Sequence, residues 1–308
     1  MFGRCTPLTT EPLAQRIDLG RYIVVSIWFG CNNNCRICML AGMKSQMPPI
    51  GLERFKDLLD QIRAEGRFDR LILSGAEVTT CDALEQYAAC AAASGWFQKI
   101  QIQTNGRRLA EGNYLRRLAA SGINEFFVSI HGPEQVHDAM VGCRGAFGQT
   151  LQGLDNLEAL AVNVISNTVL TRANVAGIPA LMSLLGSRRI GEHHLWNYFP
   201  MEGSDTKDMV VDLGTLNQLL PKMVDALDRS GRPLVLKGFP ECLPVGGPVV
   251  IDSTFPQTCL PDRFWTAFGE NGFGFCPHRP GCRAGHCWGL SSAYVNRYGD
   301  ERNLLRPF

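Results

Sequence analysis

RYIVVSIWFGCNNNCRIC, residues 21–38, joins an apolar run to three cysteines, Cys31, Cys35 and Cys38. The apolar run predicts a buried β-strand over residues 21–29. The glycine- and asparagine-rich loop behind it places the three thiols within eight positions. This spacing allows a zinc knuckle completed by a distant fourth ligand, three unconnected buried thiols, or a four-iron cluster that keeps one iron open.

Composition narrows the class of protein. The chain has 308 residues, of which 45% are apolar and 19% charged, so it can bury a large core. The net charge of +1 argues against nucleic acid as a partner bound through bulk charge. The longest apolar run has about eight residues, too few to span a membrane, and we expect a cytoplasmic protein. In that compartment, twelve cysteines indicate metal ligands or free thiols rather than disulfides.

Apolar runs alternate with helical patterns along the chain. The pattern predicts strands over residues 21–29, 70–75, 99–106, 124–132, 162–170 and 193–199. It predicts helices over residues 52–66, 82–95, 113–122, 149–160, 178–187 and 213–231. Six β–α units fit a partial TIM-type barrel or a doubly wound sheet, and in both the chemistry lies at the carboxyl ends of the strands.

The composition changes after about residue 237, where glycine, proline and cysteine become frequent and helical periodicity fades. We therefore expect a short N-terminal arm (1–20), a barrel domain (21–237) and a cysteine-rich C-terminal extension (238–308).

The C-x3-C-x2-C motif after the first strand resembles the radical S-adenosylmethionine (SAM) superfamily, and the resemblance extends from residue 21 to about residue 201. It implies a partial (β/α)6 barrel in which Cys31, Cys35 and Cys38 hold a 4Fe–4S cluster whose open iron chelates SAM. It also implies cleavage of SAM to a 5′-deoxyadenosyl radical, which abstracts a substrate hydrogen atom. Ile37 stands where the family usually has an aromatic residue that packs against adenine.

Further marks follow at the ends of later strands. LSGAEV (73–78) resembles the family segment that receives the SAM amino group, which assigns Gly75, Ala76 and Glu77 to that role. Alternatively, Glu77 is a charge at a helix N-terminus. In VSIHG (128–132), Ser129 matches the residue that reaches the ribose or carboxylate of SAM. His131 either faces the substrate or is a structural hydrogen-bonding residue.

Two more strand ends complete the SAM site that the resemblance implies. Asn167 matches the polar contact to the ribose. Arg172 pairs with the SAM carboxylate or is a solvated loop cation. FPMEG (199–203), with Met201 at its centre, corresponds to the segment that wraps the adenine edge.

The C-terminal extension resembles the auxiliary-cluster domains of radical SAM enzymes called Twitch and SPASM. Its thiols predict a second 4Fe–4S cluster, with Cys242, Cys276, Cys282 and Cys287 as ligands. Cys259 is then a further ligand, a hydrogen-atom donor or a buried thiol. Zinc is an alternative, since His278 and His286 lie among the thiols, and a disulfide conflicts with a reducing compartment.

Together these features predict a radical SAM enzyme that modifies a peptide and carries an auxiliary cluster. The alternative is a dehydrogenase or epimerase of a sugar, an aminocyclitol or another small metabolite, which the arm of about twenty residues before the first strand favours. A non-enzymatic iron–sulfur or zinc module is a third possibility. The resemblance also implies an electron donor such as flavodoxin or ferredoxin as a partner.

Overall fold

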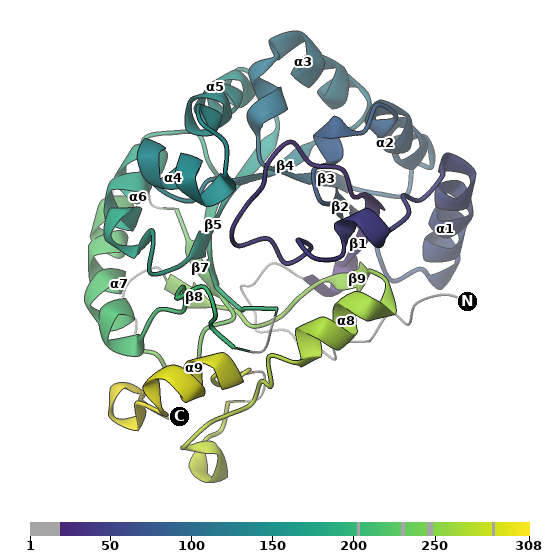
Figure 1. Cartoon of the computed structure of the whole chain (residues 1–308). Coiled ribbons are helices and arrows are strands. Elements are labelled where there is room, and N and C mark those ends of the chain that lie inside the picture. The colour runs from purple at the N-terminus through teal and green to yellow at the C-terminus, as the bar shows by residue number, and fades with distance from the viewer. Residues whose placement is uncertain (1–18, 202–203, 229–231, 245–248, 285–286) are drawn as a thin grey trace.

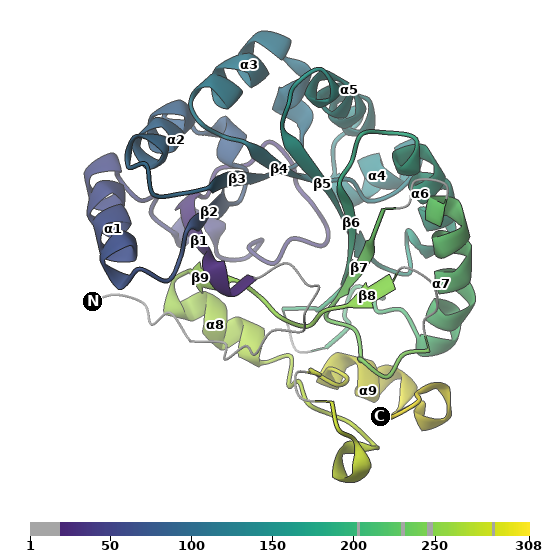
Figure 2. The ribbon, with the colours of Figure 1, turned by 180° about the vertical axis from the view of Figure 1, so that it is seen from behind.

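The computed structural model describes residues 19–201, 204–228, 232–244, 249–284 and 287–308. Within these ranges the chain forms a nine-stranded sheet in the order β8-β7-β6-β5-β4-β3-β2-β1-β9, and every neighbouring pair is parallel. The sheet curves around an interior, with helices on its outer side (Figures 1 and 2). The predicted fold class, a partial TIM-type barrel, is confirmed.

The six strands predicted from the sequence are all present, and three short strands follow them. Their bounds are β1 Tyr22–Trp28, β2 Arg70–Gly75, β3 Lys99–Thr104, β4 Glu125–Ser129, β5 Asn163–Leu170, β6 Glu192–Asn197, β7 Leu234–Lys237, β8 Val249–Ile251 and β9 Gln257–Cys259. Most of the first six strands are buried along their length, as expected when parallel strands are covered on both faces.

Within the described ranges, α1 to α7 lie between strands in sequence, and α8 and α9 follow β9. The bounds of these helices are α1 Leu52–Glu65, α2 Leu84–Ala93, α3 Gly112–Ala120, α4 Glu134–Val141, α5 Ala146–Glu158, α6 Ile178–Gly186, α7 Leu213–Asp228, α8 Asp262–Gly269 and α9 Ser292–Tyr298. Helix α1 shows why the pattern works, because it buries Phe55, Leu59 and Ile62 on one face and ends at Gly66, whose φ of 71° is left-handed. No helix in the described ranges is both long and apolar enough to cross a bilayer.

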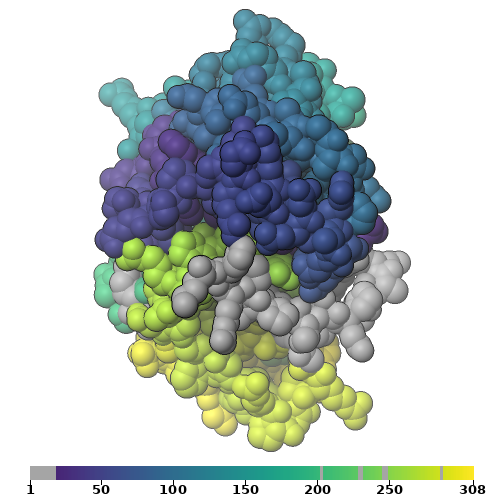
Figure 3. Space-filling view, turned by 90° about the vertical axis from the view of Figure 1, so that its right-hand side faces the viewer, coloured from purple at the N-terminus to yellow at the C-terminus, as the bar shows by residue number. Residues whose placement is uncertain are grey.

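The division into an arm, a barrel and an extension stays a prediction. Residues 1–18 of the arm lie outside the described ranges. Beyond residue 237, β8 pairs with β7 and β9 pairs with β1, so the start of the extension continues the sheet at both of its edges. The chain that follows β9 covers the flank of the barrel beside α1, where Figure 3 shows it in yellow-green.

Residues 252–256, here called the bridging segment, run from β8 at one edge of the sheet to β9 at the other. A buried ion pair fixes the start of this segment, with 2.5 Å between Lys237 Nζ and Asp252 Oδ2. Lys237 also donates to the Thr254 carbonyl oxygen (2.9 Å), and the Thr254 N–H donates to Asp252 Oδ1 (2.9 Å). The bridging segment therefore spans the side of the barrel that the sheet leaves open.

We predict that Asp252→Asn lowers the free energy of unfolding by about 3–5 kcal/mol, because it leaves the Lys237 ammonium buried without its counter-charge. Chemical denaturation followed by circular dichroism measures this. The control is Glu85→Gln, which removes an ion pair with Arg117 whose side chains are 37% and 56% exposed, and should cost less than about 1 kcal/mol. Equal losses in the two variants would contradict the prediction.

The ion pair between Lys237 and Asp252 also makes the free energy of unfolding depend on pH. Burial opposes ionisation of Asp252, but Lys237 and Thr254 outweigh it and hold the pKa of the carboxyl below its usual range. The stabilisation from Asp252 is therefore complete above about pH 4, the usual Asp pKa, and is lost as the pH falls through the lower folded-state pKa. Asp252→Asn should lack this part of the acid sensitivity.

Candidate active site

A cavity of about 220 Å³ lies at the carboxyl ends of β2 to β5, and the three clustered cysteines line it. We call it the cysteine-lined cavity. The other predicted site residues that line it are Ile37, Gly75, Ala76, Glu77, Ser129, His131 and Asn167. The structure therefore brings together residues that are spread over about 140 positions of the sequence, as expected for strand ends in a parallel barrel.

Hydrogen bonds from two neighbours hold the cysteine loop in place. The N–H groups of Asn34 and Arg36 donate to the carbonyl oxygens of Val141 and Met140 at the end of α4, both at 2.9 Å. On the other side, Arg107 Nη1 donates to Asn33 Oδ1 (2.7 Å) and to the Asn32 carbonyl oxygen (2.5 Å). Helix α4, which the sequence pattern did not predict, is thus one of the two supports of this loop.

The three thiols influence one another. Burial, followed by the charges of Cys38 and Cys31, raises the pKa of Cys35 to about 12. Burial also raises the pKa of Cys31. All three thiols line the cysteine-lined cavity, and metal binding there would release protons from thiols.

No three His, Cys, Asp or Glu side chains in the described ranges surround a point suited to one metal ion. In a 4Fe–4S cluster each thiolate binds a different iron, and three thiols that line one cavity are the kind of ligand set that such a cluster uses.

Gly75 allows the chain after β2 to approach β1 closely. A Cβ atom at this position would lie 1.9 Å from the Trp28 carbonyl oxygen, and φ is +140°. The next two N–H groups, of Ala76 and Glu77, donate to the carbonyl oxygens of Trp28 (2.8 Å) and Gly30 (3.0 Å). The Ala76 carbonyl oxygen accepts no hydrogen bond from the described residues, which suits it to receive an ammonium group.

Glu77 is buried and accepts four hydrogen bonds. Its donors are the Thr79 N–H (3.1 Å) and hydroxyl (2.6 Å), the Thr104 hydroxyl (2.7 Å) and the Asn105 N–H (2.6 Å). Burial raises the pKa of Glu77, and these hydrogen bonds oppose the shift. The carboxylate also caps the short 3-10 helix Val78–Thr80, so the helix-terminus alternative describes a large part of its role.

Ser129 and Asn167 stand opposite each other on β4 and β5. Asn167 Nδ2 donates to Ser129 Oγ at 3.2 Å. Asn167 Oδ1 is buried and has no hydrogen-bond partner within the described residues. A buried acceptor without a donor costs free energy, and a ribose hydroxyl would supply the missing donor. The pair therefore fits the contact that the resemblance implies.

His131 is a neutral hydrogen-bond donor. Its Nδ1 accepts the N–H of Val169 at 3.2 Å, so the ring proton is on Nε2. Burial, with a smaller contribution from His137, lowers the pKa of His131 to about 3. Nε2 has no partner within the described residues, and the ring lines the cysteine-lined cavity, so this N–H is available to a ligand there.

A neighbouring cavity of about 320 Å³ contains the predicted adenine contacts. Ile37 and Met201 line it with Tyr198 and Phe199, which follow β6. Ile37 lines both cavities, so it lies where the ribose and adenine parts of SAM would meet. Residues 202–203 of the predicted FPMEG segment lie outside the described ranges.

Arg172 lines neither the cysteine-lined cavity nor the neighbouring cavity with the predicted adenine contacts. Its Nη1 donates to the Tyr298 hydroxyl (3.1 Å), and its Nε lies 3.5 Å from Asp208 Oδ1. The side chain is 44% exposed. The predicted contact with the SAM carboxylate is therefore not supported, and Arg172 is a surface cation that joins α9 to the barrel.

The pKa of Cys242 responds to the three other predicted tail ligands. Burial, followed by the charges of Cys287, Cys276 and Cys282, raises the pKa of Cys242 to about 11. The Sγ atom of Cys287 accepts the N–H groups of Glu241 (3.4 Å) and Gly289 (3.3 Å), as sulfur ligands of clusters commonly do. For the zinc alternative, His278 Nε2 contacts the Arg302 carbonyl oxygen (3.1 Å), and His286 lies outside the described ranges.

Cys259 lies apart from this thiol group. It ends β9 beside Val25 of β1 and packs against the main core. Its neighbours Thr258 and Leu260 line the interior of the barrel, and Cys259 does not. Alternate residues of a strand face opposite sides, so the structure does not support Cys259 as a hydrogen-atom donor.

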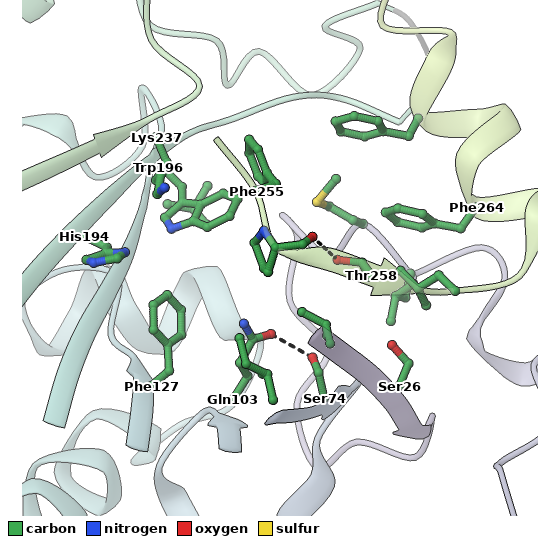
Figure 4. Close-up of a pocket in the computed structure, with 18 of the residues that line it drawn as sticks. Ser26, Ser74, Gln103, Phe127, His194, Trp196, Lys237, Phe255, Thr258 and Phe264 are labelled. Atoms are coloured by element: carbon green, nitrogen blue, oxygen red, sulfur yellow. Dashed lines mark hydrogen bonds between the residues drawn. The ribbon is translucent and has the colours of Figure 1, made fainter. Parts of the chain in front are cut away.

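A third cavity, of about 450 Å³, occupies the barrel interior. We call it the barrel cavity. Figure 4 shows Trp196 and Phe255 on one side of it, Phe264 on the other, and Gln103 hydrogen-bonded to Ser74 between them. Sequence reasoning missed these residues. The aromatic-rich stretch 255–288 was the available signal, because so many rings in a short tail need a shared surface to pack against.

Comparison with known proteins identifies the family. The model of the radical SAM superfamily matches residues 25–185, more than half of the chain. The chain belongs to the radical SAM superfamily, so the prediction of an enzyme is confirmed and the non-enzymatic module is wrong. Membership implies a 4Fe–4S cluster and SAM as cofactors.

Among sequence relatives, Fe-coproporphyrin III synthase of Methanosarcina barkeri is 28% identical over 214 residues, which are 68% of this chain and 51% of that protein. The sporulation killing factor maturation protein SkfB of Bacillus subtilis is 22% identical over 171 residues, 54% of this chain and 41% of that protein. The chain therefore spans about half the length of the curated relatives it matches.

Solved structures share the fold. SuiB of Streptococcus suis bound to the precursor peptide SuiA has a TM-score of 0.60 at 16% identity, over 83% of this chain and 53% of that chain. The enzyme anSMEcpe with bound AdoMet and a Cp18Cys peptide has a TM-score of 0.62 at 12% identity, over 93% and 92% of the two chains.

We predict that Gly75→Ala weakens SAM binding at least about tenfold, because its Cβ would overlap the Trp28 carbonyl oxygen and push β1 away from β2. Isothermal titration of SAM into anaerobically reconstituted protein measures this. The control is Gly148→Ala on the exposed face of α5, where a Cβ meets nothing within 4 Å. A Gly75→Ala protein that binds SAM like the wild type would refute the prediction.

Proposed function

We propose that this chain is a radical SAM enzyme that modifies a peptide, with a second iron–sulfur cluster in its C-terminal part. In this proposal Cys31, Cys35 and Cys38 hold the first cluster. When bound, that cluster supplies the electron that cleaves SAM. The protein holds the cofactors in a fixed relation to the substrate and keeps water away from the radical.

The residues around the cysteine-lined cavity position SAM in this proposal. The Ala76 carbonyl oxygen receives the SAM amino group, and Asn167 and Ser129 bind the ribose. Ile37, with Tyr198 and Met201, packs against the adenine. His131 donates its Nε2 proton to a SAM oxygen, and because its pKa lies near 3, this donor is present over the whole physiological pH range.

The observation that carries the proposal is the position of the tail thiols next to the barrel cavity. We infer that Cys242, Cys276, Cys282 and Cys287 hold the second cluster, because the charges of the other three thiols act on Cys242. Trp288, the residue after Cys287, lines the barrel cavity and stacks on Phe255 at 4.5 Å between ring centroids. In this proposal only the rings of Trp288 and Phe255 separate a tail cluster from the substrate. At that separation the cluster can exchange an electron with a substrate radical.

The choice of a peptide substrate rests on the structural neighbours. SuiB is described with a precursor peptide and anSMEcpe with a peptide, and the second chain matches almost the whole of this one. The small-metabolite alternative stays open because the sequence relatives include a coproporphyrin synthase and heme synthases. We further propose flavodoxin or ferredoxin as electron donor and a cytoplasmic location.

We predict that reduced, reconstituted protein releases 5′-deoxyadenosine from SAM and that Cys35→Ala abolishes the release, because two thiolates cannot present the cluster to SAM. Liquid chromatography of the nucleoside products measures this. Cys90→Ala, a half-buried thiol on α2, is the control and should retain release. Unchanged release by Cys35→Ala would refute the assignment of the first cluster.

We predict that replacing Cys276, Cys282 and Cys287 with Ala removes about half of the bound iron and leaves 5′-deoxyadenosine release intact. Iron analysis and electron paramagnetic resonance measure this, with circular dichroism as a check on folding. Cys242→Ala should lose the same iron and Cys259→Ala none. Full iron in the triple variant, or zinc in the wild-type tail, would show that no auxiliary cluster is present.

A further inference from the structure

The barrel cavity offers no unpaired charge to a ligand. Among the described residues that line it, Lys237 is the single cation, and none is Asp or Glu. The Lys237 ammonium is already paired with Asp252, and both side chains are at least 94% buried. Burial lowers the pKa of His194, and its Nε2 contacts Glu192 at 3.0 Å. A charged ligand would have to leave water without gaining a counter-ion.

Aromatic rings form much of the wall. Phe255 lies between Trp196, whose ring meets it edge-on at 5.0 Å, and Trp288, whose ring stacks on it at 4.5 Å. Phe127 meets the ring of His194 edge-on at 5.4 Å on a neighbouring part of the wall. Such surfaces favour another flat ring, which adds offset or edge-to-face contacts to the burial of apolar area.

One neutral donor stands at the border with the SAM site. Gln103 lines both the barrel cavity and the cysteine-lined cavity. Its Oε1 accepts the Ser74 hydroxyl at 2.7 Å, which fixes the amide so that Nε2 is free to donate. Within the described residues this Nε2 has no partner. Gln103 is therefore suited to orient a carbonyl or another uncharged acceptor of the ligand.

The two cavities adjoin each other. Ile37, Cys38, Gly75 and Phe127 are among the residues that line both of them. A ligand held in the barrel cavity therefore lies next to the place where SAM would bind, which is what hydrogen abstraction requires.

We propose that the barrel cavity binds an uncharged aromatic side chain of the substrate, with Gln103 donating a hydrogen bond to a neutral acceptor beside it. This inference rests on the proposed function and names the group on which it acts. It disfavours a macrocycle with several carboxylates, because each carboxylate buried without a cation would cost several kcal/mol. The names of the sequence relatives indicate porphyrin chemistry for those proteins. The lining of the barrel cavity favours a different, uncharged ligand in this chain.

Three probes test this proposal by isothermal titration into the reconstituted full chain with SAM. They are N-acetyltryptophan amide, N-acetyltryptophan and coproporphyrin III, which share aromatic character and differ in carboxylates. The amide should bind with a dissociation constant below about 1 mM, N-acetyltryptophan at least about tenfold more weakly, and coproporphyrin III not measurably. Tighter binding of either carboxylate, or no binding of the amide, overturns the proposal.

Ile165→Phe tests whether the ligand binds in the barrel cavity. Ile165 lines this cavity and not the cysteine-lined cavity, and a larger side chain there takes the space of the ligand. It should weaken amide binding at least about tenfold. Phe308→Ala, at a 63% exposed ring that lines neither cavity, is the matched control and should bind like the wild type. Unchanged affinity in Ile165→Phe places the binding elsewhere and overturns the proposal.

If circular dichroism shows that Ile165→Phe does not fold, Phe255→Ala replaces it. This variant removes the ring between Trp196 and Trp288 and should weaken amide binding about threefold or more. Release of 5′-deoxyadenosine by the wild type in the same preparation tests the proposed function separately. Intact release without amide binding refutes the aromatic-ligand inference alone.

Discussion

The buried carboxylate of Glu77 joins the ends of three strands. Its own N–H is bonded to Gly30 after β1, and its side chain accepts donors from Thr104 and Asn105 at the end of β3. Because Gly75 lets the chain pass against Trp28, the turn after β2 cannot move without breaking these bonds. The cysteine loop starts at Gly30, which is bonded to Glu77, so these hydrogen bonds also fix where the loop begins. A carboxylate that receives four hydrogen bonds in a buried site is well suited to this role.

The sequence alone was sufficient for the parts of the fold with long, regular patterns. Six strands and six helices follow from periodicity and from glycine stops such as Gly66. The three-residue strands β8 and β9 are too short to show an alternation, and β1, the partner of β9, is distant in sequence. Helix α4 has only eight residues, and Pro133 before it is a weak start signal next to the stronger helix that follows.

The sequence predicts a candidate site residue best where a distinctive residue type falls in or just after a strand of the barrel. The clustered thiols follow β1, Gly75 ends β2, and Asn167 lies within β5 opposite Ser129 at the end of β4. Arg172 and Cys259 each kept more than one interpretation, because a sequence does not show on which side of the backbone a side chain lies. Arg172 turns outward to Tyr298 and Asp208, and Cys259 turns toward the core. The barrel cavity was missed because its walls come from many segments, spread along the chain from Leu19 to Trp288.

The C-terminal part is a wall of the barrel interior as well as an extension of the sheet. The ion pair between Lys237 and Asp252 fixes the bridging segment, and Phe255 from that segment packs against Trp288 of the cysteine-rich tail. Any metal bound by the tail thiols would stabilise the loop that carries Trp288, since ligated metal contributes folding free energy. The segment that would carry the tail metal is therefore also the segment that supplies an aromatic ring to the wall of the barrel cavity.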